Sequence, residues 1–147
     1  KNSDYSLFIV GEPAPNHRAY YEQCKAEAGD NVTFVGRLNY DELITYYLES
    51  EIHVMPSWFE TTGLASLESA FLGCKVVVSP MGDTRDYFGD MVTYCDPGSV
   101  QSIRSAIDLA HSKAIDERLK DKVVSTYNWE NTARITASVY ERILAKK

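Results

Sequence analysis

Two acidic residues with a glycine between them form the part of this sequence best suited to chemistry. Glu60 and Glu68 follow an apolar run at 52–55, and Gly63 lies between them. An ionised carboxylate accepts hydrogen bonds and donates none, so both residues suit ligand hydroxyls better than anions. At a helical rise of about 1.5 Å per residue the two would lie about 12 Å apart. That span resembles a sugar on one side of a diphosphate and a ribose on the other.

The residues after Glu60 predict an anion site at the start of a helix. Thr61 and Thr62 are suitable caps, and Gly63 in the first turn lets a ligand approach the backbone closely. The free N–H groups and the positive end of the helix dipole favour a phosphate there. We expect the apolar face of this helix to carry Glu68 on the same stripe as three further residues, Leu64, Leu67 and Phe71.

A purely structural interpretation of the two glutamates stays open. Glu60 also fits as a charge that complements the helix dipole, and Glu68 as the partner of a nearby Arg or Lys. Two glutamates at this spacing arise often by chance. Their position after an apolar run, with a glycine and a capped helix between them, favours a functional role.

The elements that position these residues alternate along the chain. Short apolar runs, mostly continuous, predict strands buried on both faces at 7–10, 32–35, 52–55, 76–78 and 92–95. Helical spacing fills the intervals, with Asn39 and Glu42 as a capping box, and a long helix closes the chain. The pattern predicts an α/β fold: a parallel sheet with helices on both faces. Ligands bind such sheets at the carboxyl ends of the strands. The charged stretch 113–126 is expected to be a surface helix and crossover.

The size and charge of the chain exclude several classes of protein. Its 147 residues are enough for one domain and not for two. No apolar run approaches the roughly 20 residues that cross a bilayer. The net charge of −6 argues against nucleic acid as a partner. Gly11 is followed by Glu12 and Pro13, so the first strand lacks the glycine pattern of nicotinamide enzymes, and no P-loop is present.

We expect no metal site and no bound cofactor. The histidines lack ligand-spaced partners, and His53, inside a strand, is expected to be a core residue; the three are His17, His53 and His111. An odd number of cysteines without a C-x-x-C pair indicates buried free thiols in a reducing cytoplasm: Cys24, Cys74 and Cys95. Because Lys1 begins no charged-then-apolar leader, and no Met precedes it, we expect a piece of a longer cytoplasmic protein.

Several motifs follow one another over nearly the whole chain, at 7–11, 31–38, 41–43, 56–70, 73–78, 82–86, 95–97 and 128–130. With these motifs in this order, the chain resembles the nucleotide-sugar-binding C-terminal half of the retaining GT-B glycosyltransferases of family four. The resemblance implies a Rossmann-like domain, here 1–147, that binds a nucleotide-diphosphate sugar without an obligatory metal. It also implies an N-terminal acceptor domain in the same protein, through which the protein would associate with the inner face of a membrane.

The resemblance also implies roles for individual residues. Glu60 matches the glutamate that contacts the donor sugar, as the catalytic residue, and Glu68 matches the one that holds the ribose. The backbone at Thr62, Gly63 and Leu64 matches the amides that approach the diphosphate and sugar. Gly36 and Arg37 match the turn beside the base.

The sequence departs from the family pattern in three places. After the glycine turn of the fourth strand, Asp86 stands where relatives frequently carry a glutamate. Thr61 and Thr62 stand where many relatives carry Gly-Phe or Phe-Gly, so contacts to the sugar are expected to differ. The family's first strand and helix, with the Arg and Lys that neutralise the leaving diphosphate, have no counterpart before Lys1. Two other functions therefore stay open. One is a non-catalytic nucleotide-sugar-binding partner subunit. The other is a GT-B sugar-nucleotide epimerase or phosphorylase.

Overall fold

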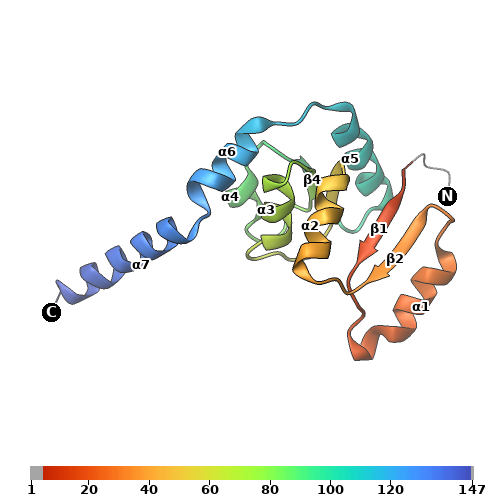
Figure 1. Ribbon diagram of the computed structural model, residues 1–147, viewed down its shortest axis with the longest axis horizontal. Coiled ribbons are helices and arrows are strands. Elements are labelled where there is room, and N and C mark those ends of the chain that lie inside the picture. Colours follow the sequence, from red (N-terminus) through yellow and green to blue (C-terminus); the bar gives the residue numbers. More distant parts are fainter. Residues whose placement is uncertain (1–4, 147) are drawn as a thin grey trace. The chain divides into compact units, whose positions relative to one another are not determined.

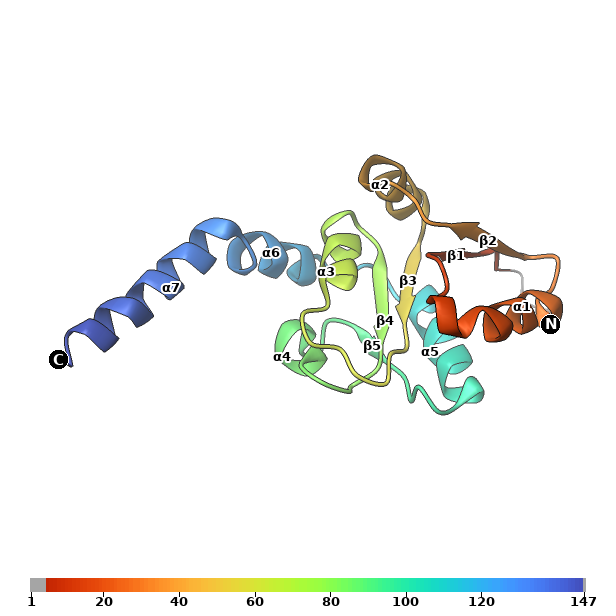
Figure 2. The same cartoon turned by 90° about the horizontal axis from the view of Figure 1, so that it is seen from below.

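The computed structural model describes residues 5–146, and the chain divides into two compact units, Lys1–Ile44 and Thr45–Lys147. Figure 1 labels most of the helices and strands, and Figure 2 also labels β3 and β5. Those of the first unit are β1 (Leu7–Val10), a short 3-10 helix (Pro15–His17), α1 (Arg18–Glu27) and β2 (Val32–Gly36). Helix α2 (Tyr40–Glu49) runs across the division between the units.

In the first unit β1 and β2 form a parallel pair. Leu7 pairs with Val32, and the register shifts between Ile9 and Val10. The predicted capping box is confirmed: the Asn39 side chain accepts from the Glu42 amide at 3.0 Å, and the Glu42 carboxylate accepts from the Asn39 amide at 2.9 Å. All four residues of β1 are exposed, which differs from the expectation of a strand buried on both faces.

The second unit contains a three-stranded parallel sheet in the order β3-β4-β5. Its elements are β3 (Ile52–Met55), α3 (Leu64–Phe71), β4 (Lys75–Val78), α4 (Thr84–Phe88), β5 (Thr93–Tyr94), α5 (Val100–Ser112), α6 (Glu117–Thr126) and α7 (Trp129–Leu144). The parallel α/β architecture is therefore confirmed. The pairing among the described residues forms two sheets, where one was expected, and β5 is shorter than the predicted run 92–95.

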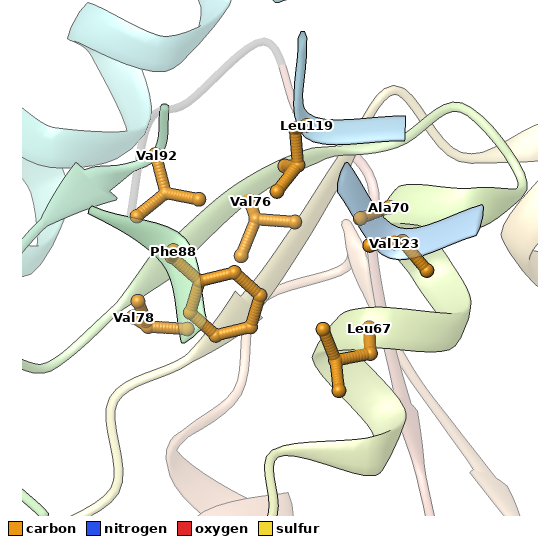
Figure 3. Close-up of a cluster of buried hydrophobic side chains, with 8 residues drawn as sticks. All are labelled: Leu67, Ala70, Val76, Val78, Phe88, Val92, Leu119 and Val123. Atoms are coloured by element: carbon orange, nitrogen blue, oxygen red, sulfur yellow. The ribbon is translucent and has the colours of Figure 1, made fainter. Parts of the chain in front are cut away.

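Strand β4 is the centre of the core because helices cover both of its faces. Val76 and Val78 face a cluster formed with α3, α4 and α6, whose buried members are drawn in Figure 3. Val77 points the other way, toward Ala106 and Ala110 of α5. Figure 2 shows α3 and α5 on opposite sides of this sheet. The alternation of side chains along one strand thus joins two apolar layers.

One expectation about the helices is wrong, and another is incomplete. On α3 Leu64 and Phe71 are exposed, and the residues that pack inward are mostly small: Ser66, Leu67, Ser69 and Ala70. Small side chains bring this helix close to the sheet, and the hydroxyl of Ser69 stays bonded to the carbonyl oxygen of Ser66 at 3.0 Å. The stretch 113–126 is more than a surface crossover, because Leu119 and Val123 of α6 belong to the core.

The thiol predictions hold in part. Cys74 and Cys95 are buried free thiols, and burial raises the pKa of Cys74 to about 11, but Cys24 is only half-buried. Within residues 5–146, no three His, Cys, Asp or Glu side chains lie close enough together to hold a metal ion. Over the same residues, every helix is too short or too polar to span a membrane.

Candidate functional site

The segment that contains Glu60 lies at the carboxyl edge of the β3-β4-β5 sheet, where it joins the turn that follows β4. The Glu60 carbonyl oxygen accepts from the Asp83 amide at 2.9 Å, and the Glu60 amide donates to the Met81 carbonyl at 3.4 Å. The Ser79 hydroxyl donates to the carbonyl oxygen of Ser57. Two loops that follow neighbouring parallel strands are therefore held together, as the location of ligand sites in such sheets requires.

Gly82 is essential to this junction. It forms an isolated parallel bridge with Glu60 and has a φ of +78°, where residues with a side chain are strained. A Cβ atom at this position would collide with the carbonyl oxygen of Glu60. Thr84, which is 2% exposed, anchors the same turn through a 2.7 Å hydrogen bond from its hydroxyl to the Ser79 carbonyl. The backbone around Glu60 is thus fixed from both sides.

The start of α3 differs from the predicted one in its cap. Gly63 is the N-cap residue, in a left-handed conformation with a φ of 56°, and no side chain caps the helix there. Thr61 and Thr62 therefore do not act as caps. The Glu60 carboxylate turns back instead, and its Oε1 atom accepts from the amides of Thr61 and Gly63, both at 3.1 Å. A carboxylate at this place complements the positive end of the helix, as the structural interpretation of Glu60 anticipated.

The amide groups that begin α3 remain open. Within the described chain, the N–H groups of Leu64 and Ala65 have no hydrogen-bond acceptor, and the first bond inside the helix joins the Leu67 amide to the Gly63 carbonyl at 2.9 Å. Leu64 is 63% exposed and Ala65 half-buried, whereas Ser66, the next residue, is buried. The helix end thus offers unsatisfied donors to an anion.

Glu68 lies one helical turn further along α3 and is half-buried. Among residues 5–146, no Arg or Lys pairs with its carboxylate and no hydrogen bond satisfies it. The structural interpretation, an ion pair within the chain, is therefore not seen. A half-buried carboxylate without a partner is free to accept hydrogen bonds from a ligand.

His53 of β3 contacts α3 on the side that faces the sheet. Its Nε2 atom lies 3.1 Å from the Ser66 hydroxyl, and its ring packs edge-on against Tyr47 at a centroid distance of 5.8 Å. Burial lowers the pKa of His53 to about 4, so the ring is neutral at pH 7. The prediction of a satisfied core histidine is confirmed, and this contact fixes the first turn of α3 on the sheet.

Two residues of this edge were not among the predicted site residues. Gly82 could have been noticed as a glycine in the turn after a predicted strand. Trp58 is 71% exposed, and its ring stands so close to Gly98 that a Cβ atom there would meet it at 3.0 Å. No pattern in the sequence indicates that contact between the turns after β3 and β5.

Gly36 and Arg37 belong to the first unit. Gly36 ends β2 with a φ of 84°, and its carbonyl oxygen accepts from the Gly11 amide at 2.8 Å. Arg37 is exposed. Glu60, Gly63 and Glu68 all belong to the second unit. The assignment of Gly36 and Arg37 to a base-binding region therefore stays a prediction.

Comparison with known proteins gives one family and one fold. The family model described as "Glycosyl transferases group 1" matches residues 1–126. Glycogen synthase of Mycobacterium tuberculosis is 29% identical over 142 residues, which are 92% of this chain and 34% of that protein. An uncharacterized glycosyltransferase of Methanocaldococcus jannaschii is 30% identical over 144 residues, 92% of this chain and 36% of that protein.

Among solved structures, sucrose-phosphate synthase from Thermosynechococcus elongatus superposes with a TM-score of 0.82. The match covers 97% of this chain and 39% of that one, at 23% identity, and it shows that the two share a fold. The chain spans about a third of the length of the curated relatives it matches, 34% and 36%.

Proposed function

We propose, from the premise that this chain belongs to the glycosyl transferases group 1 family, that it is the donor-binding half of a retaining glycosyltransferase. The reaction would move a sugar from a nucleotide-diphosphate sugar to a hydroxyl of a glycan, lipid or other acceptor. One observation carries this proposal: the open amides of Leu64 and Ala65 lie between two carboxylates, Glu60 and Glu68, at the carboxyl edge of the sheet.

Each part of this arrangement suits one part of the donor. The open amides and the helix dipole suit the diphosphate, which carries the negative charge. The Glu68 carboxylate has no partner in the described residues and suits the ribose hydroxyls. The Oε1 atom of Glu60 accepts from the amides of Thr61 and Gly63. Its Oε2 atom has no hydrogen-bond partner among residues 5–146 and suits a hydroxyl of the sugar.

The proposed chemistry depends on charge at the leaving group. As the bond to the sugar breaks, negative charge grows on the diphosphate, and fixed N–H donors stabilise it without having to reorganise. We propose that this donor half needs no metal ion. We expect an N-terminal domain of the same cytoplasmic protein to bind the acceptor. Any association with a membrane would also be made by that domain.

Binding to the full-length protein tests the donor assignment. UDP-, ADP- and GDP-sugars are first screened for thermal stabilisation, because a ligand that binds only the folded state raises its apparent stability. Calorimetry with the best donor should then show that Glu68→Ala weakens binding by about tenfold to a hundredfold, since a hydrogen bond to a charged group is worth about 1.5 to 3 kcal/mol. Glu60→Ala should weaken binding of the sugar nucleotide more than binding of the free nucleotide.

The matched control is Glu22→Ala on the exposed face of α1, which should bind the donor normally. Normal donor binding by both the Glu60 and the Glu68 variants would remove the assignment. A labelled donor separates the alternatives: a glycoside product supports the transferase, an epimerised sugar or a sugar phosphate the other enzymes, and binding without turnover the partner subunit.

A further inference from the structure

A hollow lies at the edge of the same sheet opposite the Glu60 segment, where β4 and β5 begin. It has a volume of about 630 Å³, and its lining includes Lys75, Val76 and Thr93 from the first residues of these strands. The connection from α5 to α6 forms another wall, from Ala110 to Lys120. Ligand pockets commonly measure about 300 to 1,000 Å³, so this hollow has the size of a small-molecule site.

The floor of the hollow is apolar. Ala70, Val76 and Leu119 line it, and Figure 3 shows these side chains gathered between α3, β4 and α6. Cys74 also lines it, but its thiol donates to the Tyr47 carbonyl oxygen at 3.1 Å, and burial raises its pKa to about 11. These floor side chains are only 2 to 5% exposed, so most of the apolar contact area in the hollow comes from Ile115, which is 49% exposed, and the half-buried Met91. The floor offers no reactive group.

The rim is charged, and its cations are less well paired than its acids. Arg118 engages two of the three rim carboxylates, Asp116 at 2.6 Å and Asp90 at 3.7 Å. Lys113 and Lys120 have no carboxylate within ion-pair distance among residues 5–146, although Lys120 lies 5.9 Å from the centre of the Phe71 ring.

Two further charged residues complete the rim. Glu117 is the remaining acid and stands in the first turn of α6, where the helix dipole favours it. Lys75 is held by Glu51 at 2.7 Å. The rim thus leaves two ammonium groups available against one carboxylate, on a chain whose net charge is −6.

From this cavity and its rim we propose a binding site for a small organic anion: an apolar ring or short aliphatic body for the floor, and one negative group for Lys113 and Lys120. The apolar part would displace water from the floor, and the negative group would meet the two ammonium groups at the mouth. The site is separate from the proposed donor site, and it depends on neither Glu60 nor Glu68.

The test uses a fluorescent probe of this chemistry, anilinonaphthalene sulfonate, with the full-length protein. Phenyl-naphthylamine serves as its uncharged counterpart. The sulfonate should bind with a saturable isotherm and more tightly than the neutral dye. The double variant K113E/K120E should weaken it by about tenfold, because two partly exposed charge pairs together amount to about 1.4 kcal/mol. Glu68→Ala should leave its affinity unchanged.

The matched control is K25E/K146E, which changes the net charge equally at two exposed positions outside the hollow. Equal dye affinity for the two double variants overturns the proposal, and so does equal affinity for the two dyes. If K113E/K120E does not fold, Ala114→Trp replaces it: Ala114 is exposed at the rim, and the indole should block the dye. Unchanged dye binding to a folded Ala114→Trp protein also overturns the site.

Discussion

Strands β1 and β4 have nearly the same sequence character and opposite environments. Strand β1 is apolar throughout and β4 is apolar after Lys75, yet the valines of β4 are 0 to 2% exposed, whereas the four residues of β1 are 37 to 48% exposed. Strand β4 has a paired strand on each edge and helices over both faces. Strand β1 pairs with β2 alone among the described residues. An apolar run therefore predicts a strand, but its burial depends on neighbours that lie elsewhere in the sequence.

The glycines that follow these two strands should show the largest difference. Gly82→Ala should destabilise the protein by about 3 to 5 kcal/mol, because strain at positive φ adds to a collision with backbone. Gly11→Ala should cost about 1 to 2 kcal/mol, because its φ of 131° is unfavourable but nothing lies within 4 Å of the new Cβ. Urea denaturation measures both, and equal losses would contradict the rigid junction at Glu60.

A smaller difference is expected for side chains within the strands. Val77→Ala should cost about 2 to 3 kcal/mol because it leaves a cavity between β4 and α5. Ile9→Ala should cost about 1 kcal/mol in this chain, since the residue is 37% exposed.

Repeating the Ile9→Ala measurement in the full-length protein sharpens the comparison. If a preceding strand pairs with β1, as the family resemblance implies, the cost of Ile9→Ala should approach that of Val77→Ala. An unchanged cost would contradict that expectation.

The last effect, similar in size to that of Gly11→Ala, concerns pH and the contact between His53 and α3. Burial lowers the folded-state pKa of His53 to about 4 from 6.5, so below pH 6.5 the unfolded chain binds a proton that the folded chain does not. Stability should therefore fall with decreasing pH between 6.5 and 4, by about 1 to 2 kcal/mol from pH 7 to pH 5. Denaturation of the wild type and His53→Phe at several pH values measures it, and equal pH dependence would show that His53 is not the titrating group.

The strands and the start of α3 could be predicted from the sequence because both depend on local signals. The runs at 7–10 and 52–55 match β1 and β3 residue for residue, and the Asn39–Glu42 capping box forms as its spacing indicated. Glu60 and Glu68 flank the start of α3 because that helix begins directly after the predicted turn.

What could not be predicted depends on distant partners. Ser66 and Ser69 face inward on α3 because His53 and a backbone carbonyl satisfy their hydroxyls, and neither partner is visible in a hydrophobic pattern. The inward return of the Glu60 carboxylate follows from the left-handed turn at Gly63, which competes with capping by threonine. Leu119 and Val123 stand in a charged stretch of sequence, and only the packing of α6 against α3 and β4 shows that they are core residues.

The hydrogen bonds that Glu60 makes to its own loop bear on the heat of donor binding. Oε1 of Glu60 already accepts from the Thr61 and Gly63 amides within the protein itself. If a donor takes over either amide, one acceptor is exchanged for another and the total number of bonds barely rises. Calorimetry would then record little binding enthalpy from these two amides. The favourable free energy of that contact would come mainly from water that the donor releases.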